Sequence, residues 1–369
     1  MKYQFMRKLS KALLVTILGY VFLLSACTEK QDNTVYYNND NLHYSGRIEY
    51  NTQDSSSAMY WPGNAVSISF KGTDISVLLK DINGKNYFNI ILDDSVSLLH
   101  TKKGKKWYTL ANNLKDTIHT IEVFRRMTST PIYFYAFKTN IGGEFLKTPK
   151  KSRSIEFYGN SITEGASNLD YSGKEPEVWD SIYSDNYLSY GAITARHFDA
   201  EYSCIARGGI GLMLSWYPLT MPQMYNRLNP DDSTSKWDFT KNIPDIVVIN
   251  LFQNDAALVN RPEHPQFKAH FGKTAPDSTF IINSYYDFLK NIRAYYPDAK
   301  IICTLGAMNA TRKDLPWRGY VKSAVDKMED DNIYTYFFFY KGGYFHPKAE
   351  EHKRMADSLI NFIDRERIW

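Results

Sequence analysis

The period of the hydrophobic pattern changes once along this chain, and that change constrains the fold more than any other feature. From residue 43 to 147 apolar residues recur at every second position, as in Val66, Ile68 and Phe70. Successive side chains of a β-strand point to opposite faces, so this alternation predicts short strands. Gly and Asn turns separate the runs, which indicates an antiparallel sandwich. The first half is therefore expected to be all-β.

The pattern of residues 152–369, which follow a basic linker, is different. Strand-like apolar runs alternate with helix-like segments, which predicts a parallel sheet wrapped by helices. The expected strands are 155–158, 201–206, 246–251, 300–305 and 333–338, and the expected helices are 183–198, 284–296, 317–328 and 349–365. The second half is therefore expected to be an α/β domain.

The N-terminus has the features of an export signal. Basic residues precede an apolar run from Ala12 to Leu24, which leads into Ser25-Ala26-Cys27. A run of about 13 residues is too short to cross a bilayer, so residues 1–26 are expected to be a signal peptide. The cysteine resembles that of a bacterial lipobox, with a plain signal peptide and an incidental cysteine as the alternative. We therefore expect a lipid on Cys27, followed by a polar tether over residues 27–42.

These features predict location and exclude one class of partner. The protein is expected to be exported and lipid-anchored in the cell envelope, facing the periplasm or the cell surface, with the lipid as its only membrane contact. The formal charge of +4 includes several cations within residues 1–26, so the rest of the chain is near neutral. A near-neutral chain argues against a nucleic-acid partner.

Chemically useful residues follow four of the expected strands at the points where they end. Ser161 lies just beyond the first strand among glycines, where its side chain is exposed and its own N–H can act as an oxyanion donor, although a helix cap is an equal alternative. Gly209 follows the second strand, Asn254 the third and His346 the fifth. Because parallel strands place these loops at one sheet edge, the four could supply a nucleophile, two donors and a base.

The order Ser, Gly, Asn, His resembles that of the SGNH (GDSL-type) hydrolases, and more closely the acetyl esterases of carbohydrate esterase family two. The sandwich half matches through Trp61-Pro62-Gly63 and the stretch 117–126. The resemblance implies an all-β jelly-roll sandwich before a flavodoxin-like α/β domain with strand order 2-1-3-4-5. It implies Ser161 as nucleophile, His346 as base, and Ser161, Gly209 and Asn254 as the oxyanion hole.

Three positions depart from the family pattern. Asn160 replaces an Asp before the nucleophile, and Gln253 stands in a block where Gly-Thr-Asn-Asp is commoner. Gly343 occupies the position, three residues before the base, of the acid that orients the imidazole. A backbone carbonyl near Gly343, a carboxylate from elsewhere, or an inactive protein would each account for it. Family two includes dyads of the first kind, so we expect a Ser-His pair with a carbonyl.

Other residues near these blocks are expected to be structural, or have a structural and a functional interpretation of equal weight. His264, His270 and His352 are expected to be structural or surface residues, and Asp255 is expected to brace the oxyanion loop. The tryptophans flanking the loops could stack on sugar, with core packing as the equal alternative; they are Trp179, Trp216 and Trp237.

The implied strand order also bears on the two remaining cysteines. Cys204 would lie on the second strand and Cys303 on the fourth, which are not neighbours in that order. Their Cα atoms would then be farther apart than the roughly 7 Å limit for a disulfide, so two buried free thiols are expected.

The resemblance implies an esterase that removes O-acetyl groups from hemicellulose-type polysaccharides or oligosaccharides through an acyl-enzyme. The same machinery could act on peptidoglycan or a lipid, and a catalytically dead glycan-binding surface lipoprotein is the alternative outside enzymes. The sequence has no metal-ligand spacing and no phosphate-binding loop, so no metal or cofactor is expected.

Overall fold

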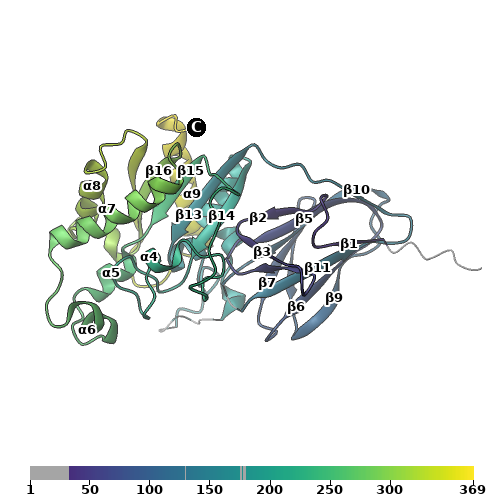
Figure 1. Cartoon of the computed structure of the whole chain (residues 1–369), viewed down its shortest axis with the longest axis horizontal. Coiled ribbons are helices and arrows are strands. Elements are labelled where there is room, and N and C mark those ends of the chain that lie inside the picture. Colours follow the sequence, from purple (N-terminus) through teal and green to yellow (C-terminus); the bar gives the residue numbers. More distant parts are fainter. Residues whose placement is uncertain (1–32, 129, 175–176, 178–179) are drawn as a thin grey trace, which may run out of the picture.

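The computed structural model describes residues 33–369 apart from 129, 175–176 and 178–179. The expected signal peptide, Cys27 as the expected site of lipid attachment, and Trp179 lie outside the described residues. Two domains lie side by side, with the strands of the first half on the right of Figure 1 and the helix-wrapped sheet on the left. The predicted layout of an antiparallel β domain followed by an α/β domain is confirmed.

The first domain is built from two antiparallel sheets. One has the order β3 (Ile48–Asn51), β4 (Ser56–Met59), β11 (Ile132–Lys138), β6 (Ile75–Asp81), β9 (Gly104–Ala111), with β1 (Thr34–Tyr36) also paired to β11. The other has the order β12 (Glu144–Leu146), β5 (Ala65–Gly72), β10 (Thr117–Arg125), β7 (Tyr87–Leu92), β8 (Ser95–His100), with β2 (His43–Ser45) also paired to β5. Val66, Ile68 and Phe70 are fully buried in the shared core, as the alternation predicts.

The expected tether over residues 27–42 is wrong in its second part. Thr34–Tyr36 forms strand β1, which pairs antiparallel with β11, and Val35 and Tyr37 are buried in the sandwich. The segment is polar overall, but an edge strand needs only one buried apolar face while its backbone pairs with a neighbour. The sandwich therefore begins before residue 43.

The second domain contains one five-stranded parallel sheet. Its order is β14 (Ala200–Ala206), β13 (Arg153–Gly159), β15 (Ile246–Asn250), β16 (Lys300–Ala307), β17 (Ile333–Tyr340). Val247 and Ile249 of β15 pack into a core with α7 (Ser278–Tyr295) and α8 (Trp317–Asp326). Ile246 and Val248 pack into a second core with α3 (Tyr190–His197) and α9 (Ala349–Arg365). The central strand is thus buried on both faces, as its continuous apolar run predicts.

Short elements occupy the connections between these strands and helices. They are α2 (Ser161–Glu164), η1 (Ser181–Tyr183), η2 (Asn186–Leu188), α4 (Met221–Met224), α5 (Gln253–Leu258), α6 (Pro265–Phe271) and η3 (Asn309–Thr311). The single helix expected over residues 183–198 is wrong, because two 3₁₀ turns precede α3. The side chains of Asp180, Asp185 and Ser189 each accept a backbone N–H bond and start a new turn, which favours separate turns over one helix.

The two cysteines are buried free thiols, as expected. Cys204 lies on β14 and Cys303 on β16, and strands β13 and β15 lie between them. The separation across two intervening strands rules out a disulfide.

A buried ion pair joins the two domains. Arg47 of the sandwich and Glu156 of β13 are both almost fully buried, with Nη2 and Oε1 3.3 Å apart. Arg47 Nη2 also donates to the Tyr158 hydroxyl at 3.0 Å, and Nη1 to the carbonyl of Arg227 at 3.1 Å. This contact fixes the sandwich against the strand that leads to Ser161.

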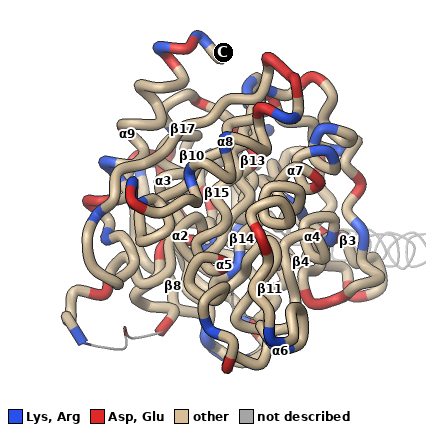
Figure 2. Tube along the Cα trace, turned by 90° about the vertical axis from the view of Figure 1, so that its left-hand side faces the viewer, with Lys and Arg blue, Asp and Glu red and all other residues tan. Residues whose placement is uncertain are grey.

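Charged residues of both signs are interspersed along the chain trace in the view of Figure 2. Lys and Arg alternate with Asp and Glu at loops and helix ends, so this view shows no stripe of one sign. Within the residues described, no helix combines the length and apolar character that a membrane span requires.

Candidate active site

The register of the parallel sheet brings the ends of three strands to one edge. Gly159, at the end of β13, pairs with Ala206 on β14 and with Asn250 on β15. The loops that follow these strands therefore leave the sheet side by side, at the edge where open α/β sheets bind ligands. They carry the predicted residues Ser161, Gly209 and Asn254.

Ser161 begins helix α2 directly after β13. Asn160 caps this helix, since its side-chain oxygen accepts a bond from the Ile162 N–H at 3.0 Å. Gly165 ends the helix with φ of 80°, a left-handed conformation that glycine adopts without steric cost. The capping role therefore belongs to Asn160 and leaves the Ser161 hydroxyl available for another partner.

That partner is His346, in the connection between β17 and α9. Ser161 Oγ lies 2.8 Å from His346 Nε2. Both residues are mostly buried, at 6% and 8% exposure. A hydroxyl that donates to a neutral imidazole nitrogen is the arrangement in which the base can take the serine proton. The structure brings together the two residues predicted as nucleophile and base.

The expected carbonyl near Gly343 is not the group that pairs with the imidazole; a carboxylate from elsewhere is. His346 Nδ1 is hydrogen-bonded to Glu177 Oε2, and Glu177 Oε1 accepts from the His346 backbone N–H at 2.9 Å. Glu177 lies in the connection between α2 and η1, 169 residues before His346 in the chain. A carboxylate that accepts two bonds from one residue orients a ring better than a single carbonyl, and it adds a charge.

Lys348 holds Glu177 from the other side. Its Nζ donates to Glu177 Oε1 at 2.8 Å and to the Ser167 carbonyl at 3.0 Å. Burial alone would raise the pKa of Glu177, but the hydrogen bonds and positive charges of His346 and Lys348 outweigh it and lower the pKa to about 2. Glu177 is therefore an anion at any ordinary pH, able to stabilise an imidazolium.

The predicted donors Gly209 and Asn254 are linked through one residue. Trp216 donates its backbone N–H to the Gly209 carbonyl at 3.0 Å and its indole N–H to Asn254 Oδ1 at 3.0 Å. Asn254 Nδ2 donates to the Ile210 carbonyl at 2.7 Å. An amide nitrogen has two hydrogens, so one remains for a ligand. The indole bond fixes which end of the Asn254 amide is the donor.

Asp255 has the structural role expected of it. Its buried carboxylate accepts backbone N–H bonds from Leu212 at 3.0 Å, Met213 at 2.6 Å and Leu214 at 2.9 Å. These bonds tie the segment after Gly209 to the helix that carries Asn254. The loop and the amide are thus held in a fixed relation.

The two described tryptophans differ in their surroundings. Trp216 is 43% exposed, and its indole N–H supports Asn254, a role that the sequence did not suggest. Trp237 is half-buried in the core of the second domain, and the Arg47 guanidinium lies over its ring at 5.3 Å. The environment of Trp237 therefore favours core packing over sugar stacking.

The other histidines lie outside the Ser161–His346 pair. His352 is fully buried, accepts from the Tyr190 N–H at 3.2 Å, and has a pKa lowered to about 3 by burial. His264 caps α6, and His270 is exposed beside it. None of the three takes the place of His346 at Ser161.

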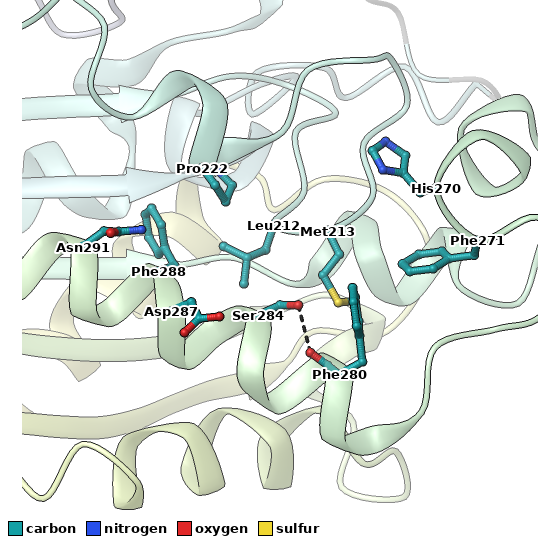
Figure 3. Close-up of a pocket in the computed structure, with 10 residues that line it drawn as sticks. All are labelled: Leu212, Met213, Pro222, His270, Phe271, Phe280, Ser284, Asp287, Phe288 and Asn291. Atoms are coloured by element: carbon teal, nitrogen blue, oxygen red, sulfur yellow. Dashed lines mark hydrogen bonds between the residues drawn. The ribbon is translucent and has the colours of Figure 1, made fainter.

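A pocket of about 290 Å³ lies behind the loop that Asp255 holds (Figure 3). Leu212 and Met213 form one side, and Phe271 of α6 and Phe280 of α7 point toward Met213. Ser161 and His346 do not line it. This pocket is therefore separate from the Ser161–His346 pair.

Three comparisons bear on this architecture. The family model of the carbohydrate esterase 2 N-terminal domain matches residues 44–149. The chain is 29% identical to the cellulase/esterase CelE of Acetivibrio thermocellus over 90% of its length, and spans 40% of that protein. It is 26% identical to an acetylxylan esterase / glucomannan deacetylase of Cellvibrio japonicus, over 89% of this chain and 92% of that protein.

A solved structure agrees with both domains. The family two carbohydrate esterase from Clostridium thermocellum in complex with cellohexaose has a TM-score of 0.77 and 28% identity, and the match covers 88% of this chain and 98% of that one. The enzyme class that these relatives support is an esterase. Residues 44–149 thus match a carbohydrate esterase 2 N-terminal domain, and the resemblance of the whole described chain to the family two carbohydrate esterases is confirmed.

Proposed function

We propose that this protein is a carbohydrate esterase that removes O-acetyl groups from hemicellulose-type polysaccharides or oligosaccharides. The hydrogen-bonded series Ser161, His346, Glu177 at the carboxyl edge of the parallel sheet carries this proposal. A serine, a neutral imidazole and an anionic carboxylate in this order form the arrangement that activates a hydroxyl for acyl transfer. The strand order and the relatives' printed activities support the same conclusion.

In the first step, His346 Nε2 accepts the Ser161 proton while Oγ attacks the ester carbonyl. The developing oxyanion is held by the N–H groups of Ser161 and Gly209 and by the Asn254 amide. Glu177 keeps the other imidazole nitrogen protonated and stabilises the positive charge that forms on His346. His346 then protonates the departing sugar oxygen, which leaves an acetyl group on Ser161.

In the second step, water replaces the sugar. His346 takes a proton from this water, the hydroxide attacks the acetyl carbonyl, and Ser161 leaves with the proton returned by His346. Acetate is released, and every proton is accounted for without an added group. The same oxyanion donors serve both steps because both pass through a tetrahedral intermediate.

Different observations support the proposed acyl group and the proposed location. Two relatives from Cellvibrio japonicus, at 26% and 23% identity, are each described as an acetylxylan esterase / glucomannan deacetylase, which favours acetyl on a hemicellulose over a lipid or peptidoglycan ester. The basic and apolar N-terminus that ends at Cys27 supports export and a lipid anchor in the cell envelope. An anchored enzyme of this kind would meet its polymer outside the cytoplasm.

The test is acetate release from acetylated xylan, acetylated glucomannan and 4-nitrophenyl acetate. Wild-type protein should release acetate, and Ser161→Ala and His346→Ala should each lower kcat by a factor of about 10³ to 10⁶. His270→Ala is the matched control, since that histidine is exposed and distant in the chain from the pair, and it should retain wild-type rates. A wild-type protein that binds xylan on an affinity gel and hydrolyses no ester would contradict the proposal in favour of a glycan binder.

A further inference from the structure

Glu164 is a buried carboxylate that the mechanism above does not use. It is the last residue of α2, three positions after Ser161, and is 1% exposed. Its Oε2 accepts from the Gly208 N–H at 2.7 Å, and its Oε1 accepts from the Thr128 N–H at 3.1 Å. Thr128 lies in the connection between β10 and β11 of the sandwich. One side chain thus joins helix α2, which begins with Ser161, to the Gly208–Gly209 segment and to the other domain.

Tyr217 holds the next peptide, which joins Gly208 to Gly209. The Tyr217 hydroxyl donates to the Gly208 carbonyl at 3.0 Å. In a planar trans peptide the C=O and the following N–H point in opposite directions, so this bond determines where the Gly209 N–H points. Gly209 has φ of +78°, and a Cβ there would lie 3.1 Å from the Tyr217 ring, which explains why glycine is needed.

We propose that Glu164 and Tyr217 are positioning residues that hold the Gly208–Gly209 backbone in the orientation needed for the oxyanion hole, and that the sandwich supports this hole through Thr128. The proposal deepens the proposed esterase function and rests on it. Glu164 fixes the peptide before Gly208, and Tyr217 fixes the one after it. Preorganised donors cost no reorganisation during reaction, so their support affects the rate more than substrate binding.

The charge state of Glu164 adds a pH dependence to this geometry. Burial raises its pKa to about 7, against the opposing effects of the Thr128 and Gly208 hydrogen bonds and the Arg207 charge. The other titratable groups that interact with it are Arg125, Cys204 and Tyr217. As a carboxylate, Glu164 accepts both N–H bonds; once protonated, one oxygen becomes a donor. The support should therefore weaken as the pH falls through about 7.

Kinetics of Glu164→Gln and Tyr217→Phe on 4-nitrophenyl acetate test the positioning role in the full-length protein. We expect Glu164→Gln to lower kcat about 10- to 100-fold and Tyr217→Phe about tenfold, with KM changed less than about threefold. When kcat is plotted against pH, the inflection near pH 7 that comes from Glu164 should be absent in the Glu164→Gln variant. A conservative Glu164→Asp variant should recover less than the wild-type rate, because its shorter side chain reaches only one N–H.

Asp185→Asn is the matched control, because it alters a buried carboxylate at the same domain boundary. Asp185 Oδ1 accepts from Asn89 of the sandwich at 2.8 Å, and Asp185 Oδ2 lies 3.4 Å from Arg126. Neither contact involves the Gly208–Gly209 segment. The Asp185→Asn protein should therefore be less stable than wild type and keep kcat within about twofold. Equal losses of kcat in the Glu164 and Asp185 variants would overturn the proposal, as would a Glu164→Gln variant with wild-type kcat.

A second readout does not depend on turnover. In protein labelled with ¹⁵N-glycine, the Gly208 amide resonance should titrate near pH 7, and Glu164→Gln should abolish this titration while Asp185→Asn retains it. Tyr217→Phe should move the Gly209 resonance and speed its amide exchange. A Gly208 resonance without titration would overturn the Glu164 contact. If wild-type protein is inert toward esters, the proposed function fails, and these spectra still decide whether the backbone support exists.

Discussion

Glu156 and Glu177 are each paired with a cation, and their surroundings differ. Glu156 lies on a central strand and is enclosed by Arg47 and by hydroxyls, among them those of Ser203 and Tyr296 at 2.9 Å each. Glu177 lies in a loop at the open sheet edge, between His346 and Lys348, whose side chains are 10% and 20% exposed. The first cluster joins two domains, and the second orients a base.

The difference shows how one kind of ion pair can serve stability or chemistry. Around Glu156 the partners come from strands, from the residue that caps the end of α7 and from the other domain, and Glu156 is 1% exposed. Removal of Arg47 would therefore leave an unpaired buried charge. Glu177 lies in the connection between α2 and η1 and bonds to the imidazole nitrogen that does not face Ser161, so the approach to the Ser161 hydroxyl does not depend on it. The single variants of Glu177, Arg47 and Lys348 below each break one member of one cluster and ask whether the rate or the stability changes.

Among the carboxylates and cations of these two clusters, the largest effect is expected at Glu177. Glu177→Gln should lower kcat by a factor of about 10² to 10⁴ with little change in KM, because an amide favours the wrong imidazole tautomer and removes the charge that stabilises the imidazolium. The measurement is steady-state hydrolysis of 4-nitrophenyl acetate. Glu350→Gln, which alters an exposed carboxylate bonded to the Tyr171 hydroxyl, is the control. Wild-type kcat in Glu177→Gln would mean that another group orients His346.

The next effect is expected at the enclosed pair. Arg47→Ala should lower the free energy of unfolding by about 3–5 kcal/mol, because Glu156 is left buried without its cation. The kcat of the protein that remains folded should stay within about twofold. Urea unfolding followed by fluorescence measures the loss.

A double variant sharpens this result. Arg47→Met with Glu156→Gln removes both charges, so it should be more stable than Arg47→Ala alone. Equal losses in the two proteins would show that packing, and not the unpaired charge, accounts for the effect.

A buried titratable group without a counter-ion gives a third, pH-dependent effect. Burial lowers the pKa of His352 to about 3, with a smaller contribution from the nearby Lys348 charge, whereas the pKa of an unfolded histidine is ~6.5. The folded state therefore keeps its full stability above ~6.5 and loses it as the pH falls toward 3, by about 1.4 kcal/mol per unit. Unfolding of wild type and His352→Gln at pH 7 and 4.5 should show a shallower loss in the variant. Parallel pH profiles would contradict the assignment.

The smallest effect is expected at Lys348. Lys348→Met should lower kcat by a factor of about 3 to 10, because Glu177 keeps both of its bonds to His346 and loses only the outer cation. Lys353→Met, which alters an exposed lysine of α9, the helix that follows Lys348, controls for charge removal. A loss as large as that of Glu177→Gln would show that Lys348, and not the two His346 bonds, holds the loop.

Some elements could be predicted closely from local pattern. The final helix has the predicted bounds, 349–365, because its amphipathic period is uninterrupted. Val66, Ile68 and Phe70 are buried as their alternation requires. The helix starts expected at residues 183 and 284 were wrong, because the side chains of Asp185 and Asp277 cap the turns that form there. A cap depends on a single residue and not on a periodic pattern, so periodicity does not reveal it.

The sequence by itself determined the two-domain layout, the buried cysteines and the order of the loops that carry Ser161, Gly209, Asn254 and His346. The layout and the common edge of these loops follow from periodicity and from the rule that parallel strands end at one edge, and the free thiols follow from the strand order that the family resemblance implies. Only the tertiary structure decided that Glu177 orients His346 and that Glu164 connects Thr128 to Gly208. Glu177 comes from a loop without period, and Glu164 meets another domain. A contact across the fold depends on how surfaces pack, and it leaves no local pattern to be read.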